Sequence, residues 1–163
     1  MNTISSRQIN LIMVLMAAGI IGFSYFCQYQ LLLEPCLLCL MQRFLYILIG
    51  LLALLAVLQN PKQIGLRIYS TLIILVSVLG VMVAGRQVWL QHLPEDQIPS
   101  SCGPSFIDML ESFPITEILE ALFIGDGNCA DIIWQFMGFS MAEWSFLIFL
   151  MFIGINIRIW LKR

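Results

Sequence analysis

Four stretches of the chain contain no Lys, Arg, Asp or Glu and are rich in apolar residues. They cover residues 8–33, 44–61, 68–85 and 144–157, and the last continues beyond Arg158 through three more apolar residues. About 20 apolar residues are needed for a helix to cross a hydrocarbon core about 30 Å thick. The pattern therefore predicts transmembrane helices near 9–27, 39–59, 67–90 and 144–161.

The composition agrees with this interpretation, since 60% of the 163 residues are hydrophobic and only 11% are charged. Both values lie far from those of soluble proteins. We expect an all-α membrane protein, a four-helix bundle that forms a single membrane domain over residues 1–163. The first apolar run is too long for a secretory signal and ends without a small-residue cleavage site, so we expect a retained helix.

Basic residues predict the orientation of the bundle. They occur before the first helix, between the second and third helices, and at the end of the chain, at Arg7, Lys62, Arg67, Arg158, Lys162 and Arg163. The connection 28–38 has none, and the long connection 91–143 has no Lys or Arg. The positive-inside rule therefore places both termini in the cytoplasm and loops 28–38 and 91–143 outside.

The long loop 91–143 contains a second amphipathic signal. Residues 113–124 place apolar side chains at helical spacing after Pro114, with Glu117 and Glu120 on the other face. We expect a short amphipathic helix that lies flat on the bilayer. The alternative is a helix that caps the bundle without touching lipid.

Four of the five cysteines lie on the predicted outer side. Cys36 and Cys39 form a Cys-x-x-Cys at the start of the second helix, and Cys102 and Cys129 lie in the long loop. Outside the cytoplasm, disulfides form and persist. Redox exchange between the two pairs is the favoured interpretation. Two structural disulfides and a four-cysteine zinc site remain alternatives, although a second Cys-x-x-Cys, typical of zinc sites, is missing.

The residues around the Cys-x-x-Cys favour thiol reactivity. Pro35 suits a helix start, so Cys36 is expected in the first turn and Cys39 one turn later. Exposed N–H groups and the helix dipole favour a thiolate there. Arg43 follows Cys39 by four positions on the same face, where a guanidinium stabilises the thiolate and can donate hydrogen bonds to a ligand.

Two further residues have less specific signals. Cys27, near the outward end of the first helix, is expected to be a small buried hydrophobe. His92, the one histidine, lies where the third helix meets the outer surface. It could bind a ligand oxygen or relay a proton, and an ordinary interfacial histidine is the alternative.

These residues together resemble the DsbB family of disulfide bond formation proteins. The resemblance rests on Pro35-Cys36-Leu37-Leu38-Cys39 with Arg43, and on Gly85, Gln87, His92 and Cys102. Later matches are Phe113-Pro114, Gly125-Asp126-Gly127-Asn128-Cys129-Ala130, Trp134, Phe136-x-Gly138 and Met141-x-x-Trp144. The likeness covers nearly the whole chain. One departure is Gln42, where the family pattern has an acidic residue before the arginine.

The resemblance implies a bacterial inner-membrane oxidoreductase that reoxidises a periplasmic, thioredoxin-like DsbA protein and passes the electrons to ubiquinone or menaquinone. It implies that Cys36 and Cys39 lie near the quinone, with Cys39 adjacent to it, and that Arg43 and His92 belong to the same site. Cys102 and Cys129 match the pair that exchanges with DsbA.

Two rival functions are a membrane scaffold with two structural disulfides and a vitamin K epoxide reductase-like enzyme. The second is disfavoured because its catalytic pair lies late in the chain, whereas Cys36 and Cys39 lie early.

Overall fold

The computed structural model describes residues 5–30, 32, 35–94 and 134–161. Within them lie four long helices and a two-stranded hairpin: α1 Ser6–Gln30, α2 Leu37–Gln59, α3 Gln63–Gln91, β1 Gln135–Phe136, β2 Phe139–Ser140 and α6 Met141–Leu161. Each long helix is long and apolar enough to cross a membrane. The four predicted transmembrane helices are therefore confirmed, and the predicted amphipathic helix at 113–124 lies outside the described residues.

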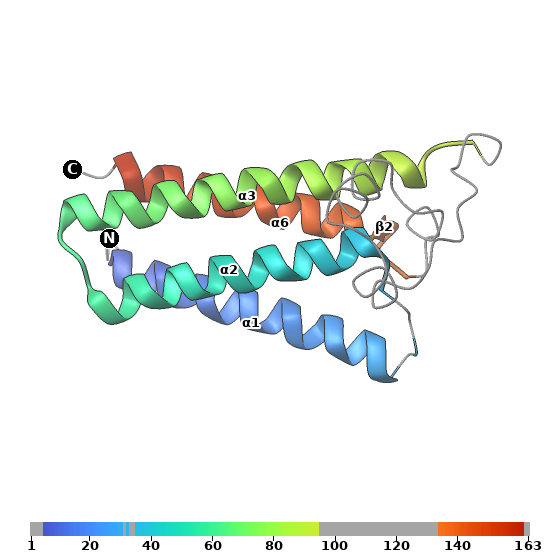
Figure 1. Cartoon of the computed structure of the whole chain (residues 1–163), viewed down its shortest axis with the longest axis horizontal. Coiled ribbons are helices and arrows are strands. Elements are labelled where there is room, and N and C mark those ends of the chain that lie inside the picture. The colour runs from blue at the N-terminus through green and yellow to red at the C-terminus, as the bar shows by residue number, and fades with distance from the viewer. Residues whose placement is uncertain (1–4, 31, 33–34, 95–133, 162–163) are drawn as a thin grey trace, which may run out of the picture.

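The helices form a bundle in which neighbours in sequence are neighbours in space (Figure 1). Helix α1 packs beside α2, α2 beside α3, and α3 beside α6. The start of α1, the connection between α2 and α3, and the end of α6 lie at one end of the bundle. The start of α2 and the hairpin lie at the opposite end, so the Cys-x-x-Cys is far from the chain termini.

Helices α1 and α6 begin three residues earlier than predicted, because each starts with a capping box. At α1, the N–H of Gln8 donates to Ser5 Oγ at 3.3 Å and the N–H of Ser5 donates to Gln8 Oε1 at 3.0 Å. At α6, Ser140 and Glu143 make the same reciprocal pair. This arrangement satisfies N–H groups that a helix start leaves open.

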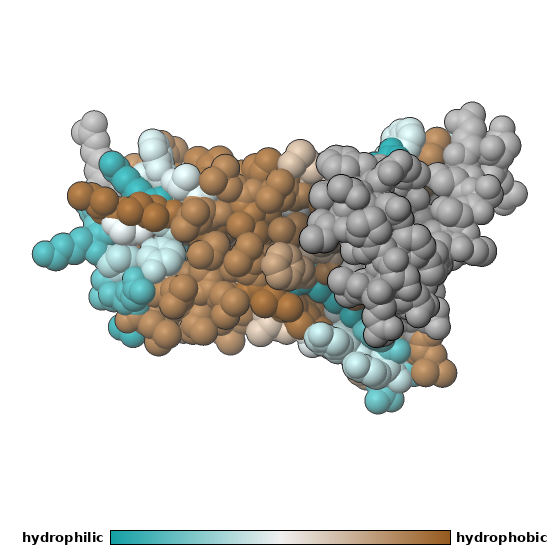
Figure 2. Space-filling view, in the orientation of Figure 1, coloured by the Kyte–Doolittle hydropathy of each residue, from teal (hydrophilic) through white to brown (hydrophobic). Residues whose placement is uncertain are grey.

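The outer surface of the bundle is apolar over most of its length. Figure 2 shows a broad hydrophobic belt around the helices, with hydrophilic residues gathered at the end where α1 begins. Large apolar side chains within this belt face outward, including Leu15 on α1 and Leu75 on α3, 64% and 57% exposed. Such a surface is suited to lipid and unsuited to water. The protein is a four-helix membrane protein.

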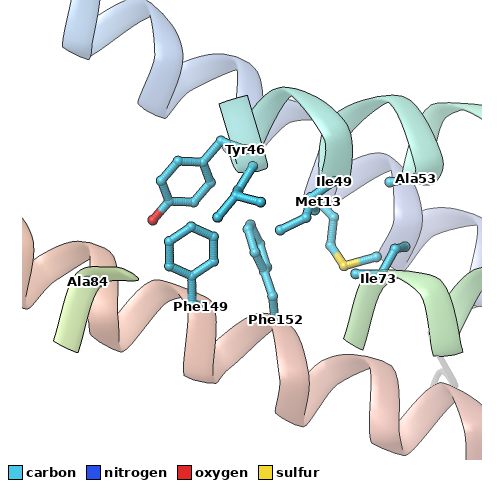
Figure 3. Close-up of a cluster of buried hydrophobic side chains, with 9 residues drawn as sticks. Met13, Tyr46, Ile49, Ala53, Ile73, Ala84, Phe149 and Phe152 are labelled. Atoms are coloured by element: carbon cyan, nitrogen blue, oxygen red, sulfur yellow. The ribbon is translucent and has the colours of Figure 1, made fainter. Parts of the chain in front are cut away.

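The middle of the bundle contains a closely packed aromatic core (Figure 3). The Tyr46 ring of α2 stacks on Phe149 of α6 with ring centroids 4.3 Å apart, and Phe152 meets Tyr46 edge-on. Gly80 of α3 lies directly against this core, because a Cβ at that position would come within 2.5 Å of the Phe149 ring. The absence of a side chain at Gly80 is what lets α3 and α6 pack so closely.

The hairpin before α6 was not predicted. Met137 and Gly138 form its two-residue turn with φ angles of 54° and 84°. A two-residue turn with two positive φ values matches the right-handed twist of the paired strands. Phe136 pairs with Phe139 across the hairpin, which brings two aromatic residues to the cysteine end of the bundle.

Candidate functional site

The Cys36-x-x-Cys39 pair lies at the start of α2. Cys36 is the N-cap residue, and its sulfur accepts a hydrogen bond from the backbone N–H of Cys39 at 3.4 Å. The two Sγ atoms lie 2.9 Å apart. Cys36 was predicted in the first turn but lies one position before it, because its side chain caps the helix. Both sulfurs therefore lie where open N–H groups and the helix dipole favour negative charge.

A pair of buried amides connects these sulfurs to α3. Gln87 Nε2 lies 3.2 Å from Cys39 Sγ and 3.6 Å from Cys36 Sγ. The carbonyl oxygen of Gln87 accepts a hydrogen bond from Gln42 Nε2 at 2.7 Å. Gln42 and Gln87 are both buried. The cysteine pair is thus contacted by a polar side chain from a helix other than its own.

Arg43 lies one turn after Cys39 and reaches across to α1. Its Nη1 donates to Gln28 Oε1, its Nη2 donates to the backbone oxygen of Ser24 at 3.3 Å, and its guanidinium lies 5.3 Å from the centre of the Tyr25 ring. Its Nε is buried and has no hydrogen-bond partner among the described residues. Arg43 therefore attaches α1 to α2, and these two hydrogen bonds use only part of its donors.

A cavity of about 500 Å³ lies beside Cys39 and Arg43. Its polar wall includes Cys39, Gln42, Arg43 and Gln87. Much of the remaining wall comes from apolar side chains of α1 and α6, including Met16, Ile20, Phe23 and Ile148. A concave, mostly apolar space with a few convergent polar groups is typical of a small-molecule site. The cavity could hold an apolar molecule with one polar end, and that end would meet the cysteine and the arginine.

Aromatic residues of the hairpin region border the cavity at its outer end. Trp134 stacks on Phe136 and meets Phe23 of α1 edge-on, with centroid separations of 5.9 and 5.5 Å. Trp144 donates from its indole nitrogen to the backbone oxygen of Phe136 at 3.2 Å. Trp134, Phe136 and Trp144 all line the cavity. We call these three residues the aromatic roof.

Comparison with known proteins shows the family of the chain. A family model described as "Disulfide bond formation protein DsbB" matches residues 6–159. The chain belongs to the DsbB family.

Several relatives are similar over almost their full length. Disulfide bond formation protein B of Hahella chejuensis is 40% identical over 160 residues, which cover 98% of this chain and 96% of the relative. The protein of the same name from Saccharophagus degradans is 42% identical over 153 residues, covering 94% and 92%. Disulfide bond formation protein B 1 of Pseudomonas aeruginosa is 38% identical over 159 residues, covering 98% and 97%.

Some of the site residues expected of a DsbB-family protein lie together in the structure. Cys36, Cys39 and Arg43 lie together at the N-terminal end of α2, and Cys39 and Arg43 share the cavity wall. His92 follows the end of α3 and lines a separate hollow of about 650 Å³ between α3 and α6, where its Nδ1 lies 2.8 Å from the backbone oxygen of Val88. Cys102 and Cys129 lie outside the described residues.

The contact of the amide pair with the sulfurs was not predicted from the sequence. Gln87 entered the resemblance only as a matching residue, and Gln42 only as a departure from the DsbB pattern. A signal was present, because both are polar residues within the predicted transmembrane helices 39–59 and 67–90, each beside an arginine. Polar groups in such segments are costly unless they are paired, and they often mark function.

Proposed function

We propose that this DsbB-family protein is a quinone-dependent thiol oxidase. In this proposal it reoxidises a DsbA-like dithiol protein and passes the electrons through two cysteine pairs to ubiquinone or menaquinone. The observation that carries the proposal is the cavity: an apolar space of about 500 Å³ whose polar wall contains Cys39 and Arg43.

The residues of the cavity suit a quinone head group. The volume lies within the range of about 300–1,000 Å³ typical of small-molecule pockets. The aromatic roof and the apolar walls suit a flat ring, and the guanidinium of Arg43 is a donor for a carbonyl oxygen. A bound quinone would supply the electron acceptor, since its uptake of two electrons and two protons gives a quinol.

The protein's part of the reaction is a series of thiol–disulfide exchanges. A thiolate of the partner attacks Cys102 of the Cys102–Cys129 disulfide, which forms a mixed disulfide and releases Cys129 as a thiolate. The partner's second thiol then closes its own disulfide and leaves Cys102 reduced. Each exchange breaks one S–S bond and forms one, so each completed cycle oxidises one partner dithiol by two electrons.

The pair at the start of α2 then oxidises the loop pair. Cys36 and Cys39 begin as a disulfide and end as a dithiol, while Cys102 and Cys129 regain their disulfide. The Cys39 sulfur lies on the cavity wall and carries the electron pair to the acceptor. The helix start and the Gln87 amide favour a thiolate at Cys39, which is the reactive form of the residue.

Arg43 and His92 have different support as quinone-site residues. Arg43 lies on the cavity wall, where its guanidinium can donate to a ligand. His92 lies in a separate hollow, so its role toward a quinone stays a prediction from the resemblance.

The localisation proposed for this activity is the bacterial inner membrane, with both termini in the cytoplasm and the cysteine loops in the periplasm. Support comes from Arg7, Lys62, Arg67 and Arg158, all near the end of the bundle opposite the Cys-x-x-Cys. Alkaline phosphatase fused after residue 100 should be active, and a reporter that works only in the cytoplasm should be inactive there. The reverse result would overturn the orientation.

Anaerobic mixing tests the activity directly. Purified protein, a reduced DsbA-like protein and ubiquinone-1 or a menaquinone analogue are combined, and quinone absorbance is followed. We expect one quinol for each partner disulfide formed, and no reaction when the partner's thiols are alkylated. Cysteine pairs that resist mild reduction and produce no quinol would support the scaffold with two structural disulfides instead.

A further inference from the structure

Gln42 and Gln87 form a polar contact inside an apolar bundle. Gln42 lies on α2, Gln87 lies on α3, and they are only 5% and 4% exposed. A buried primary amide costs free energy unless its donors and acceptor are paired, and lipid offers no water to replace a missing partner. Two such residues in contact are therefore expected to have a function that requires hydrogen-bonding groups.

The hydrogen bond between the two amides fixes the orientation of Gln87. An amide has an acceptor end and a donor end. The acceptor, Gln87 Oε1, is occupied by Gln42 Nε2 at 2.7 Å. The donor, Gln87 Nε2, is thereby directed to the cysteines, 3.2 Å from Cys39 Sγ. If the amide turned over, its oxygen would face the sulfurs and its nitrogen would face the Gln42 nitrogen.

This orientation suits a sulfur that gains negative charge. Reduction of the pair converts a neutral disulfide into thiols or a thiolate, and a thiolate is a strong acceptor. A donor held at a fixed position in a low-dielectric site stabilises such a charge more than it would in water. Arg43, by comparison, has both terminal nitrogens engaged with Gln28 and Ser24 of α1.

We propose that Gln87 stabilises the reduced state of the Cys36–Cys39 pair through its N–H group, and that Gln42 is a positioning residue that keeps this N–H group directed at the sulfurs. The two amides together set how strongly oxidising the pair is. This inference rests on the proposed function only in taking Cys36 and Cys39 as a redox pair; it requires neither a quinone nor a particular partner.

The test is the redox equilibrium of the pair with glutathione. The full-length protein carries Cys102→Ala and Cys129→Ala, so that this pair is read apart from the loop pair. Thiols are trapped by alkylation, and Cys36 and Cys39 are quantified by mass spectrometry. Gln87→Met keeps the length of the side chain and removes the donor. We expect the equilibrium to shift about tenfold toward the disulfide, or about 30 mV, the effect of losing one hydrogen bond to a charged group.

Gln42→Met tests the positioning role without touching the sulfurs. It frees the Gln87 amide to turn. We therefore expect a smaller shift in the same direction, about threefold, because the Gln87 N–H group still faces the sulfurs in part of the molecules. When Gln42→Met is added to a protein that already carries Gln87→Met, the glutathione equilibrium should shift by less than a further twofold, since the group that Gln42 positions is gone. Ser77→Ala, which removes another buried polar group of α3, is the matched control and should leave the equilibrium unchanged.

A folded Gln87→Met protein whose glutathione equilibrium stays within twofold of the parent would overturn the proposal. If Gln87→Met does not fold, the Gln42→Met protein decides alone, and an unchanged equilibrium there overturns it. Failure of the proposed quinone oxidase would appear instead as a wild-type protein that does not reduce quinone. The glutathione equilibrium would still respond to Gln87→Met in that case, so the two failures are distinguishable.

Discussion

Helix α6 faces two very different neighbours. Toward α3 it packs closely, with Phe149 against Gly80, and the same ring stacks on Tyr46 of α2. Toward α1 it borders the cavity, through residues that include Ala142 and Ile148. Away from the cysteine end, Asn156 of α6 still reaches α1, with its Nδ2 3.3 Å from Met13 Sδ. The bundle is therefore closed near the chain termini and open inside near the cysteines.

This difference separates stability from chemistry within one small bundle. Close packing on the α3 side supplies van der Waals contacts that a void would lose. The α1 side gives up such contacts and gains a space where a ligand can meet Cys39. Substitutions on the packed side should mainly change the free energy of unfolding, and substitutions on the cavity side should mainly change turnover.

The largest effect is expected for Cys39→Ser on the cavity side. Quinone reduction should be abolished, because serine cannot form the disulfide or carry the electrons. The thermal unfolding midpoint in detergent should stay close to wild type, and the Cys102–Cys129 disulfide should still form a mixed disulfide with the partner, as checked by gel shift. Turnover near the wild-type rate would show that the electrons take another path.

Gly80→Ala should give the largest effect on the packed side. The new methyl group would lie 2.5 Å from the Phe149 ring, so the ring must move out of its stack with Tyr46. We expect a loss of about 2 kcal/mol in the free energy of unfolding, the usual result of overpacking a core. Gly154→Ala on α6 is the control, because nothing lies within 4 Å of its added Cβ. Equal stability of the two variants would remove the basis for calling this side tightly packed.

Arg43→Lys tests a residue that both attaches α1 to α2 and lines the cavity. Lysine keeps the charge but lacks the planar group that reaches Gln28 and Ser24 and carries Nε. The apparent KM for quinone should rise about tenfold, as expected for one lost hydrogen bond to a charged group. Exchange between the partner and Cys102 should keep its rate. Unchanged quinone kinetics would reduce Arg43 to an anchor between α1 and α2.

Two glycines of α1 allow the smallest and most selective test. Gly19 and Gly22 both have open space around an added Cβ, but only Gly19 lines the cavity. Gly19→Leu should reduce the cavity volume and raise the KM for quinone about threefold, the effect of a modest steric change in an apolar pocket. Gly22→Leu should leave KM unchanged, while both variants keep wild-type stability. A rise of KM in both would indicate a general effect on α1 rather than on the cavity.

The sequence predicted the helices well because a bilayer imposes a simple rule on length and polarity. Their starts were less accurate: the signals Ser5-x-x-Gln8 and Ser140-x-x-Glu143 were present, but these polar residues lie just before the predicted spans, which begin at 9 and 144. The hairpin was missed because its strands are two residues long and Met137 adopts a positive φ that its residue type does not suggest.

The site was partly predictable for a similar reason. Cys36, Cys39 and Arg43 are close in sequence on one helix, so helical spacing alone brings them together. Gln87 lies 48 positions after Cys39, and only the packing of α3 on α2 places its amide beside the sulfur. The cavity depends on five segments at once, and neither hydrophobic periodicity nor a motif reports on an empty space between helices.

The hairpin region also fixes the point at which the long loop rejoins the bundle. Cys129 precedes Trp134 by five positions, and Trp134 is held against Phe23 of α1. A fully extended residue spans at most about 3.6 Å, so the Cys129 Cα lies within about 18 Å of the Trp134 Cα in any conformation. Cys102 follows His92 by ten positions and has twice that radius, about 36 Å. Two cysteines of one loop are thus joined to the described bundle by chain segments of unequal length, five positions from Cys129 to Trp134 and ten from His92 to Cys102.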